Sequence, residues 1–402
     1  MFKISVVMNT VLKKIPFFCL LCTFCFGAFL FDLKNTVRYA ILVSSIASAF
    51  LTLNRNNFSN TIKDYWCFIL PWLPWFLGIF VVIVIHGGRN AYFDTFLLLT
   101  AIFFGLKNIK IDRKWVLTAI CLTCLSLSVA VVYTVTENGL SRDIYDINRN
   151  ILMPCFTLLL VCCLAALLFE SDRYSVFFKL FMLLTCFVGL SVIVLTEVRT
   201  TLLALFALIP VVLFYQKRHR FKCLLVLFII CLTMLFLFWL TGRLQQGVSN
   251  LIAYQAGDSG SSLGIRLELW KLSFQAFLTK PLVGWGFWPF DQILASGFSF
   301  PVEWYEPSHS HNDFFFILVC SGLLGTIAWI LSIYLLIKNS LRDPIRMALL
   351  FACLAMGLTE RLWFENHKFF LLMPTIWILL YLSQPTYSVQ KNGKDPSLRE
   401  IP

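Results

Sequence analysis

Three cationic or titratable side chains lie in polar segments of an otherwise apolar chain, where they could bind an anion or carry a proton. Arg199 stands between two long apolar runs, and Arg266 and His311 lie in the longest polar stretch. The planar fork of an arginine suits a phosphate group because it gives two parallel hydrogen bonds. A neutral imidazole at His311 could act as a general base. These residue types indicate anion binding and proton transfer.

Each arginine also has a structural interpretation. Arg199 is predicted at the start of a helix, where its charge opposes the helix dipole, and at the membrane edge, where burial is costly without an anion or carboxylate. It could pair with Glu197 or contact lipid headgroups. Arg266, with Trp270 one helical turn later, could be an ordinary arginine of an amphipathic helix. The residues alone leave these alternatives open.

His311 belongs to the segment Pro-Ser-His-Ser-His-Asn-Asp at 307–313, at the predicted outer start of a helix. Ser308 or Ser310 could cap that helix, which would place His311 in its first turn. The positive potential there would favour a neutral imidazole, and free N–H groups would face an anion. A histidine with a purely structural capping role is the alternative.

No disulfide, metal ion or other cofactor is predicted. The fourteen cysteines lie in apolar runs, where a thiol acts as a small hydrophobic side chain. His309 and His311 have only Asp313 and Glu306 as further nearby ligands, which makes a weak metal site.

The composition places the chain in a membrane. Of its 402 residues, 59% are hydrophobic and 13% are charged, whereas soluble domains have roughly 45–50% apolar and about 25% charged residues. The mean hydropathy of +0.80 agrees with this assignment. The net charge of +12 is spread over short loops, which indicates membrane topology rather than nucleic-acid binding.

The hydropathy pattern predicts one all-α integral membrane domain over residues 1–402, with about twelve transmembrane helices. Residues 175–215 are too long for one span because roughly forty helical residues would reach about 60 Å. The chain must therefore turn back at Glu197 and Arg199. The predicted spans are 15–33, 36–53, 65–86, 92–106, 115–134, 151–169, 175–195, 200–215, 221–241, 313–337, 347–359 and 369–383.

Lysine and arginine are concentrated in alternate loops, which orients the chain by the positive-inside rule. Both termini are predicted in the cytoplasm, and Lys13 and Lys14 indicate an uncleaved signal anchor. A long loop over 242–311, between the ninth and tenth spans, would face outward together with Arg199.

That outer loop is predicted to contain an amphipathic helix. Ser261 and Ser262 can cap a helix over about 263–278, which Pro281 would end. Apolar side chains recur over much of its circumference, so we expect it in the membrane interface or against the helix bundle.

The histidine segment resembles a motif of the O-antigen ligases, within the bacterial ligase and polymerase superfamily of polyprenyl-linked glycans. In that motif, a histidine and a polar residue precede two glycines at fixed spacing. Here His311 and Asn312 are followed after nine residues by Gly322 and after two more by Gly325.

Two further segments resemble elements of the same family in the expected order. Residues 263–270, with Pro-Leu-Val-Gly-Trp-Gly at 281–286, are similar to its arginine-containing loop segment. Residues 196–199 resemble a Thr-x-[Ser/Thr]-Arg element, although Val198 replaces the hydroxyl residue. The resemblance covers about 165–340.

The resemblance implies a glycosyltransferase that moves an O-antigen glycan from undecaprenyl diphosphate to a sugar hydroxyl of lipid A-core. This reaction of lipopolysaccharide biosynthesis would take place on the periplasmic face of the bacterial inner membrane, without nucleotide or metal ion. His311 would activate the acceptor hydroxyl. Arg199 and Arg266 would bind the donor diphosphate and stabilise its departure.

Other residues are predicted to contact substrate. Trp270 and His309 lie beside the predicted catalytic residues, and Arg361 in the last outer loop could contact phosphate or acceptor. Arg361 could instead pair with Glu360 or Glu365. The apolar helices would hold the polyprenyl tail among the membrane lipids.

Three alternative functions remain at this stage. An O-antigen polymerase would use a second lipid-linked glycan as acceptor, and a protein O-oligosaccharyltransferase would use a serine or threonine. A transporter or flippase would place charges near the membrane midplane, whereas ionisable groups are nearly absent from the span centres here.

Overall fold

A computed structural model describes residues 43, 45–46, 55–87, 91–107, 111–138, 143–144, 147–363 and 367–383. The first predicted span and the signal anchor lie outside these residues, as does almost all of the second span. The described helices are α3 (Arg55–Ile69), α4 (Leu73–His86), α5 (Ala91–Leu106), α6 (Arg113–Asn138), α7 (Arg149–Glu170), α8 (Val176–Thr196), α9 (Thr200–Phe206), α10 (Leu208–Tyr215), α11 (Arg220–Leu240), α12 (Arg243–Gln255), α13 (Ser262–Thr279), α14 (Pro289–Ala295), α15 (Asp313–Ser340), α16 (Pro344–Gly357) and α17 (His367–Leu382).

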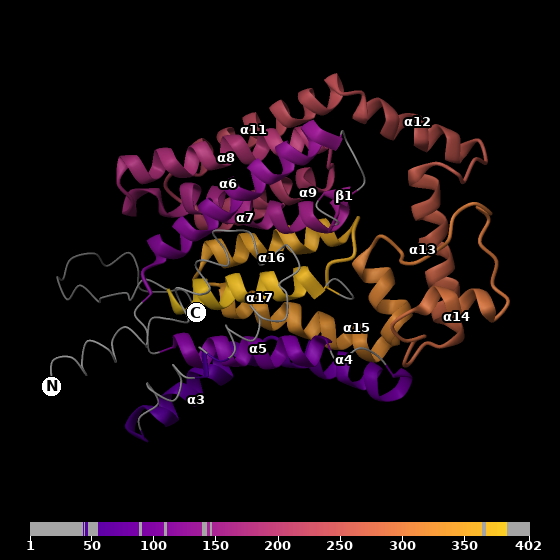
Figure 1. The fold of residues 1–402 in the computed structure, drawn as a ribbon, viewed down its shortest axis with the longest axis horizontal. Helices are drawn as coiled ribbons and strands as arrows, with labels where there is room; N and C mark the ends of the chain where they lie inside the picture. The colour runs from indigo at the N-terminus through magenta and orange to yellow at the C-terminus, as the bar shows by residue number, and fades with distance from the viewer. Residues whose placement is uncertain are drawn as a thin grey trace.

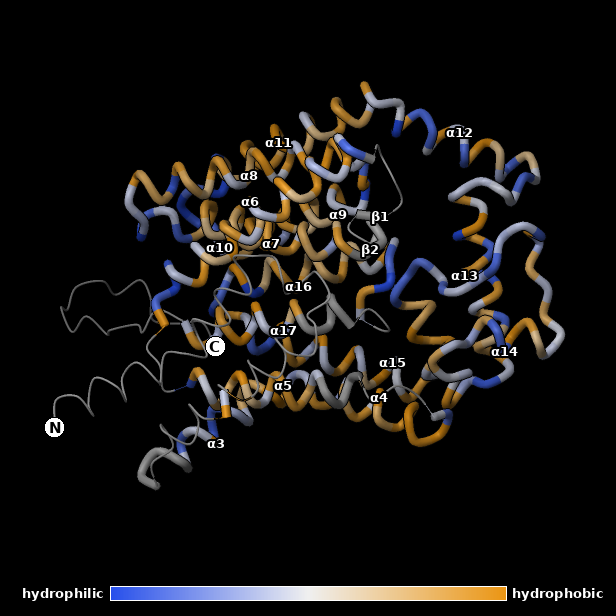
Figure 2. Tube along the Cα trace, viewed as in Figure 1, coloured by the Kyte–Doolittle hydropathy of each residue, from blue (hydrophilic) through white to orange (hydrophobic). Residues whose placement is uncertain are grey.

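These helices form an elongated bundle with an extension at one end (Figure 1). α6, α7, α8 and α11 lie in the upper part of the view, α16 and α17 in the middle, and α15, α4 and α5 along the lower edge. A short 3₁₀ helix (Ser171–Arg173) follows α7. Two antiparallel strands of two residues each, β1 (Asp143–Ile144) and β2 (Ile147–Asn148), precede α7. Apolar residues run along the bundle, and hydrophilic ones gather in the α12–α14 extension (Figure 2).

Five described helices are long and apolar enough to cross a membrane, and a bent pair could supply a sixth. The prediction of about twelve spans therefore stays a prediction. Shorter apolar helices occur at Thr95–Leu106, Thr200–Tyr215, Pro344–Gly357 and Leu372–Leu382. The five long spans are Arg113–Glu137, Leu152–Arg173, Val176–Thr196, Arg220–Leu240 and Asp313–Ser340.

The span predicted over 65–86 is not one straight helix. α3 and α4 meet there at an angle of 70°. Pro71 and Pro74 lie at the junction, and a proline cannot donate the hydrogen bond that would continue a helix. Hydropathy alone does not reveal the bend because both sides of it are apolar.

The predicted turn at Glu197 and Arg199 is confirmed. α8 ends at Thr196, Glu197 adopts a left-handed conformation with φ 56°, and α9 begins at Thr200. The following span is interrupted between α9 and α10, where Pro210 cannot donate to the carbonyl of Phe206.

The loop helix α13 forms where the sequence predicts it, because the Ser261 hydroxyl accepts a hydrogen bond from the Gly264 amide at 3.1 Å. It packs on α15 through buried residues that include Leu269 and Ala276, while Phe274 on another face is exposed.

The more strongly amphipathic helix of the loop is α12, which was not predicted from the sequence. None of its residues is buried, and Val248, Leu251 and Ile252 expose their apolar side chains. A helix of this type suits the membrane interface.

The helix that follows the histidine segment is broken at Gly322, whose φ of 60° and ψ of −159° are not helical. The 281–286 segment inserts at the break and supplies hydrogen bonds that the helix loses. These bonds are Trp285 N to Val319 O (2.8 Å), Gly286 N to Cys320 O (2.9 Å), Leu323 N to Pro281 O (2.8 Å) and Leu324 N to Leu282 O (3.2 Å).

Glycine is required where these two segments cross. A Cβ atom on Gly322 would lie 2.5 Å from the backbone of Leu282, and one on Gly284 would lie 2.5 Å from the backbone of Cys320. Both residues also have positive φ. The glycines of the two sequence motifs thus form one junction, which fixes α13 and the histidine segment relative to the bundle.

Candidate active site

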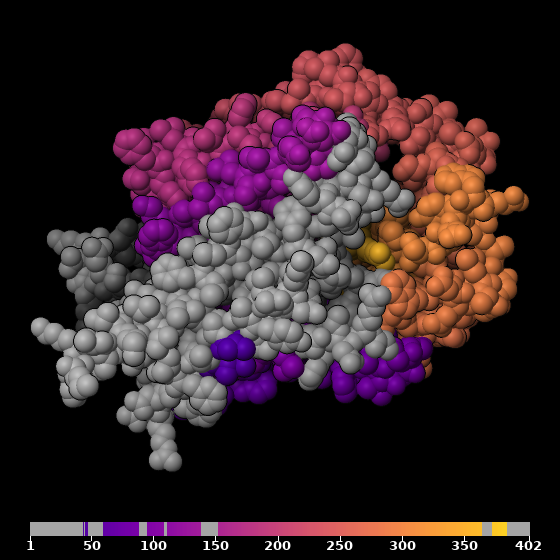
Figure 3. Space-filling model, viewed as in Figure 1, coloured from indigo at the N-terminus to yellow at the C-terminus, as the bar shows by residue number. Residues whose placement is uncertain are grey.

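A cavity of 520 Å³ lies at the C-terminal end of α8, between the α8–α9 turn, α12, the start of α13 and the segment after α16. The molecule is hollowed in this region, between the bundle and the α12–α14 extension (Figure 3). The cavity is lined by Glu197, Val198, Arg199, Thr200, Leu202, Leu203, Phe206, Arg243, Gly247, Asn250, Ser262, Leu263, Arg266, Thr359 and Glu360. Arg199 and Arg266, distant in sequence, therefore line the same space.

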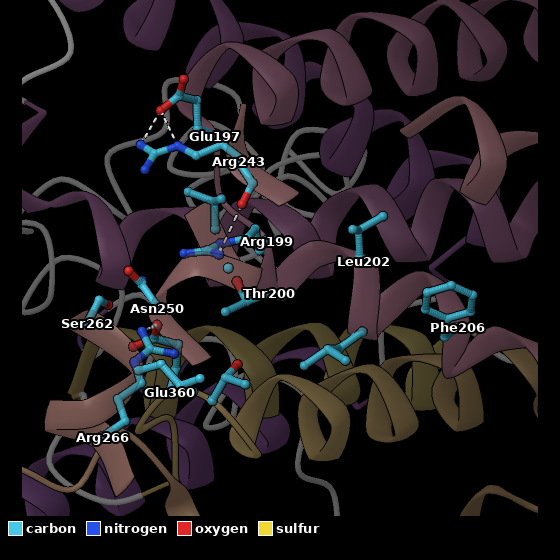
Figure 4. A pocket seen from close by; sticks show the side chains of 15 residues that line it. Glu197, Arg199, Thr200, Leu202, Phe206, Arg243, Asn250, Ser262, Arg266 and Glu360 are labelled. Atoms are coloured by element: carbon cyan, nitrogen blue, oxygen red, sulfur yellow. Dashed lines mark hydrogen bonds and ion pairs between the residues drawn. The ribbon is translucent and has the colours of Figure 1, made fainter. Parts of the chain in front are cut away.

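Arg199 lies between two other arginines of the cavity (Figure 4). Its Nη1 donates to the carbonyl oxygen of Arg243 at 3.3 Å, and it forms no ion pair with a carboxylate of the described residues. Partial burial, with the positive charges of Arg243 and Arg266, lowers the pKa of Arg199 from its usual value, although Glu197 acts in the opposite direction. Such a guanidinium is poised to bind an anion.

The alternative in which Glu197 pairs with Arg199 is wrong. Glu197 instead forms an ion pair with Arg243, at the start of α12 (Figure 4). Arg243 also donates to the side-chain oxygen of Gln246 at 2.7 Å. The role of Arg243 was not predicted from the sequence. The only signal for the pair was the predicted topology, which placed both Glu197 and Arg243 on the outer side.

Gly247 of α12 faces the guanidinium of Arg199. A Cβ atom at Gly247 would lie 3.1 Å from Nη1 of Arg199, which is tighter than an ordinary contact. The absence of a side chain lets α12 approach the cavity without displacing that guanidinium.

Glu360 links the second arginine to the histidine. Its Oε1 lies 3.2 Å from Nη2 of Arg266, and its Oε2 lies 3.5 Å from Nδ1 of His311. The Glu360 side chain is 7% exposed, so water screens these contacts weakly. His311 does not line the cavity itself but lies directly behind this carboxylate. From the sequence, Glu360 was expected only as a partner for Arg361.

The segment that carries Glu360 is held by the two residues after His311. Asn312 Nδ2 donates to the carbonyl of Leu358 at 2.9 Å. The Asp313 carboxylate accepts from the amides of Leu362 and Trp363 at 2.7 and 3.0 Å. These bonds fix the backbone on both sides of Glu360 against the backbone of the histidine segment.

The predicted cap of α15 is wrong. Asn312, rather than Ser308 or Ser310, caps the helix, and its side-chain oxygen accepts from the Phe315 amide at 3.2 Å. His311 therefore precedes the helix instead of lying in its first turn, and it adopts a left-handed conformation with φ 49°. The fully buried Ser310 hydroxyl donates to the carbonyl of Asn312 at 2.9 Å, which stabilises this turn.

Trp270 and His309 lie beside His311 but do not line the cavity. Trp270 Nε1 donates to the carbonyl of Ser310 at 2.8 Å, and its ring stacks on Phe315 at 5.6 Å. The rings of His309 and His311 lie 3.9 Å apart, centre to centre. Trp270 thus supports the histidine turn from α13, and substrate contact by either residue stays a prediction.

Arg361 is directed elsewhere. Its guanidinium lies over the ring of Phe316, 5.7 Å from the centre, and it does not line the cavity. Its predicted partner Glu360 pairs with Arg266 instead, and Glu365 lies outside the described residues.

The arrangement combines three guanidinium groups with two carboxylates in one cavity, which leaves a net positive charge beside an imidazole. It can bind an anionic group and accept a proton close to it. Within the part of the chain that is described, no group of three or more histidine, cysteine, aspartate or glutamate side chains could hold a metal ion.

Residues 181–330 match the family described as O-antigen ligase. A comparison of the chain with curated proteins finds no match. The matched region contains the turn at Arg199, the loop with Arg266, the His311 segment and the break at Gly322. Glu360 lies beyond it.

Proposed function

We propose that this chain, whose residues 181–330 belong to the O-antigen ligase family, transfers a glycan from undecaprenyl diphosphate to a sugar hydroxyl of lipid A-core. Members of this family are glycosyltransferase-like membrane enzymes that act on lipid-linked glycans. The observation that carries the proposal is the position of Arg199, whose charge has no carboxylate partner among the described residues, in the same cavity as Arg266.

The two arginines act on the leaving group. When the bond between the sugar C1 and the diphosphate oxygen breaks, negative charge grows on that oxygen. Arg199 offers hydrogen-bond donors that form no ion pair with a carboxylate of the described residues, and Arg266 approaches from α13 on another wall of the cavity. Preorganised donors of this kind stabilise the transition state more than the ground state because the charge develops toward them.

His311 acts on the acceptor. Its Nδ1 faces Glu360, so the tautomer with the proton on Nδ1 leaves Nε2 as the base. As the acceptor oxygen forms its bond to C1, its proton passes to Nε2. The imidazolium then lies beside the Glu360 carboxylate, which stabilises the positive charge. The products are the glycosylated acceptor and undecaprenyl diphosphate, and the proton returns to solvent.

The site belongs on the periplasmic side in this proposal. Positive-inside topology places the Arg199 turn and the 242–311 loop outside and both termini in the cytoplasm. Lipid-linked donor and lipid-linked acceptor would then reach the cavity from the outer leaflet of the inner membrane.

The test is transfer by the purified chain in detergent from an undecaprenyl-diphosphate glycan. Separate reactions offer lipid A-core, a second lipid-linked glycan, and a protein with accessible serines and threonines. Product on lipid A-core alone is expected. Product only on the second glycan would assign a polymerase, and product only on protein would assign an oligosaccharyltransferase. Absence of product with all three acceptors, with protein that retains its fold, would contradict the proposal.

A further inference from the structure

A second large cavity lies at the opposite end of α8 from Arg199. It has a volume of 690 Å³ and is formed by the end of α7, the start of α8, the turn before α11 and the first turns of α11. The 21 residues of α8 extend over roughly 30 Å, so the two cavities lie near opposite surfaces of a membrane.

The mouth of this cavity is basic. Lys179, Arg218 and Lys222 line it together with His219, and Asp172 is the one acidic residue among the described lining residues. The side chains of Lys179, Arg218 and Lys222 form no ion pair with another described residue. Lys179 lies about one turn inside α8 and is half-buried. This is an unusual position for a charge that has no ion-pair partner among the described residues.

The deeper part of the cavity is apolar and continues between α8 and α11. Leu183, Phe187 and Leu190 of α8 face Val226 and Ile230 of α11. A smaller cavity of 310 Å³ shares Phe187, Leu190 and Ile230 with the 690 Å³ cavity. It extends toward Leu237 near the far end of α11. We call these two adjoining cavities the α8–α11 groove.

The groove is bordered by exposed apolar side chains of the kind that contact lipid. Leu183 and Phe187 of α8 and Phe228 and Ile229 of α11 are exposed apolar side chains beside it, on helices long enough to cross a membrane. A molecule in the bilayer can therefore enter from the side with its chain between the helices and its head at the basic mouth.

We propose that the α8–α11 groove binds one anionic phospholipid. Its headgroup phosphate contacts Lys179, Arg218 and Lys222, and one acyl chain lies between α8 and α11. The charge at the mouth selects an anion, and the apolar walls select a chain at a fixed distance from it. Basic pockets between transmembrane helices on the cytoplasmic side are suited to acidic lipid headgroups. The positive-inside orientation places this mouth on that side.

The first experiment measures lipid binding by native mass spectrometry of the full chain in neutral detergent, with phosphatidylglycerol or phosphatidylcholine. R218Q/K222Q removes two cations of the mouth. K217Q/R220Q is the matched control, because it removes the same charge from adjacent exposed residues that do not line the cavity. Preferential binding of phosphatidylglycerol is expected, weakened about thirtyfold by R218Q/K222Q and much less by the control. Equal loss in both variants, or equal binding of the two lipids, would overturn the proposal.

The second experiment tests the groove. Leu190→Trp fills the point that the two cavities share, whereas Leu184→Trp places the same side chain at an exposed position of α8 outside the groove. Only L190W should weaken phosphatidylglycerol binding, with both variants unfolding near the wild-type temperature. Equal binding by L190W and L184W would exclude the acyl-chain position.

Two competitors identify the source of the phosphate. Neither inorganic phosphate nor undecaprenyl phosphate should displace phosphatidylglycerol at equal concentration. Displacement by inorganic phosphate would make the mouth a simple anion site. Displacement by undecaprenyl phosphate would assign the groove to a polyprenyl lipid, and either result would overturn the phospholipid assignment.

Discussion

Glu360, on the segment that follows α16, places a carboxylate oxygen 3.5 Å from Nδ1 of His311. The other oxygen of the same carboxylate pairs with Arg266. One side chain thereby connects the group proposed to accept a proton with a group proposed to bind the leaving diphosphate. We infer that Glu360 is a positioning residue for both.

The variant Glu360→Gln keeps the size of the side chain and removes its charge. It should lower kcat about tenfold to hundredfold, with little change in the KM of the acceptor, because the imidazolium loses its neighbouring carboxylate. Initial rates of glycan transfer measure this. Glu303→Gln makes the same chemical change at an exposed loop residue and should leave the rate unchanged.

The Glu360 effect should depend on the histidine. His311→Ala should lower kcat by about 10²–10⁴-fold, and adding Glu360→Gln to it should cost little more, since the carboxylate then has no imidazole to serve. Multiplicative effects in the double variant would show that Glu360 acts independently of His311.

Arg199→Ala should lower kcat by about 10²–10³-fold, the usual effect of removing one preorganised donor to a developing negative charge. Arg199→Lys keeps the charge but loses the bidentate fork, so it should recover part of the rate. Arg173→Ala, at an exposed arginine of the opposite end, is the control. A rate for Arg199→Lys no better than for Arg199→Ala would argue against a charge-based role.

The glycine junction should be sensitive to a single methyl group. Gly322→Ala places a Cβ 2.5 Å from the Leu282 backbone and should destabilise the fold by several kcal/mol, about as much as severe core overpacking or more. Gly297→Ala is the control, because Gly297 also has positive φ but open space around it, and it should cost only about 1 kcal/mol. Thermal unfolding in detergent compares them. Equal melting temperatures for Gly322→Ala and Gly297→Ala would contradict the close backbone contact at the junction.

A buried network of charged side chains lies at the end of the bundle opposite to the candidate active site. It predicts that the stability of the fold depends on pH. Burial raises the pKa of Asp343, but ion pairs with Arg113 and Arg346 lower it more, so the net shift is downward. A depressed carboxyl pKa stabilises the fold above the unfolded pKa of about 3.9 and loses that effect as pH falls. Asp343→Asn should therefore reduce the melting temperature at pH 7 and have a smaller effect near pH 3. A constant difference across this range would contradict the ion pairs.

The sequence predicted the elements that carry the site better than the contacts within it. The turn at Glu197, the start of α13 at Ser261 and the shared location of Arg199 and Arg266 follow from span length, capping and topology. These signals are local or concern only the side of the membrane.

The contacts that the sequence could not supply join segments far apart in the chain. Glu360 reaches His311 because Asn312 and Asp313 hold the segment after α16, and no periodicity encodes that pairing. The break at Gly322 lies between two apolar parts of α15, so hydropathy predicts a continuous span. Gly322 could be identified from its sequence motif, but its contact with the 281–286 segment could not.

Binding of undecaprenyl diphosphate to the purified chain tests the central claim most directly. Wild-type protein should bind the diphosphate lipid with much higher affinity than undecaprenyl monophosphate. The double variant Arg199→Ala/Arg266→Ala should weaken diphosphate binding at least tenfold. The R218Q/K222Q variant, altered at the other end of α8, should bind it as the wild type does. Equal binding of the diphosphate lipid by wild type and Arg199→Ala/Arg266→Ala would contradict the account.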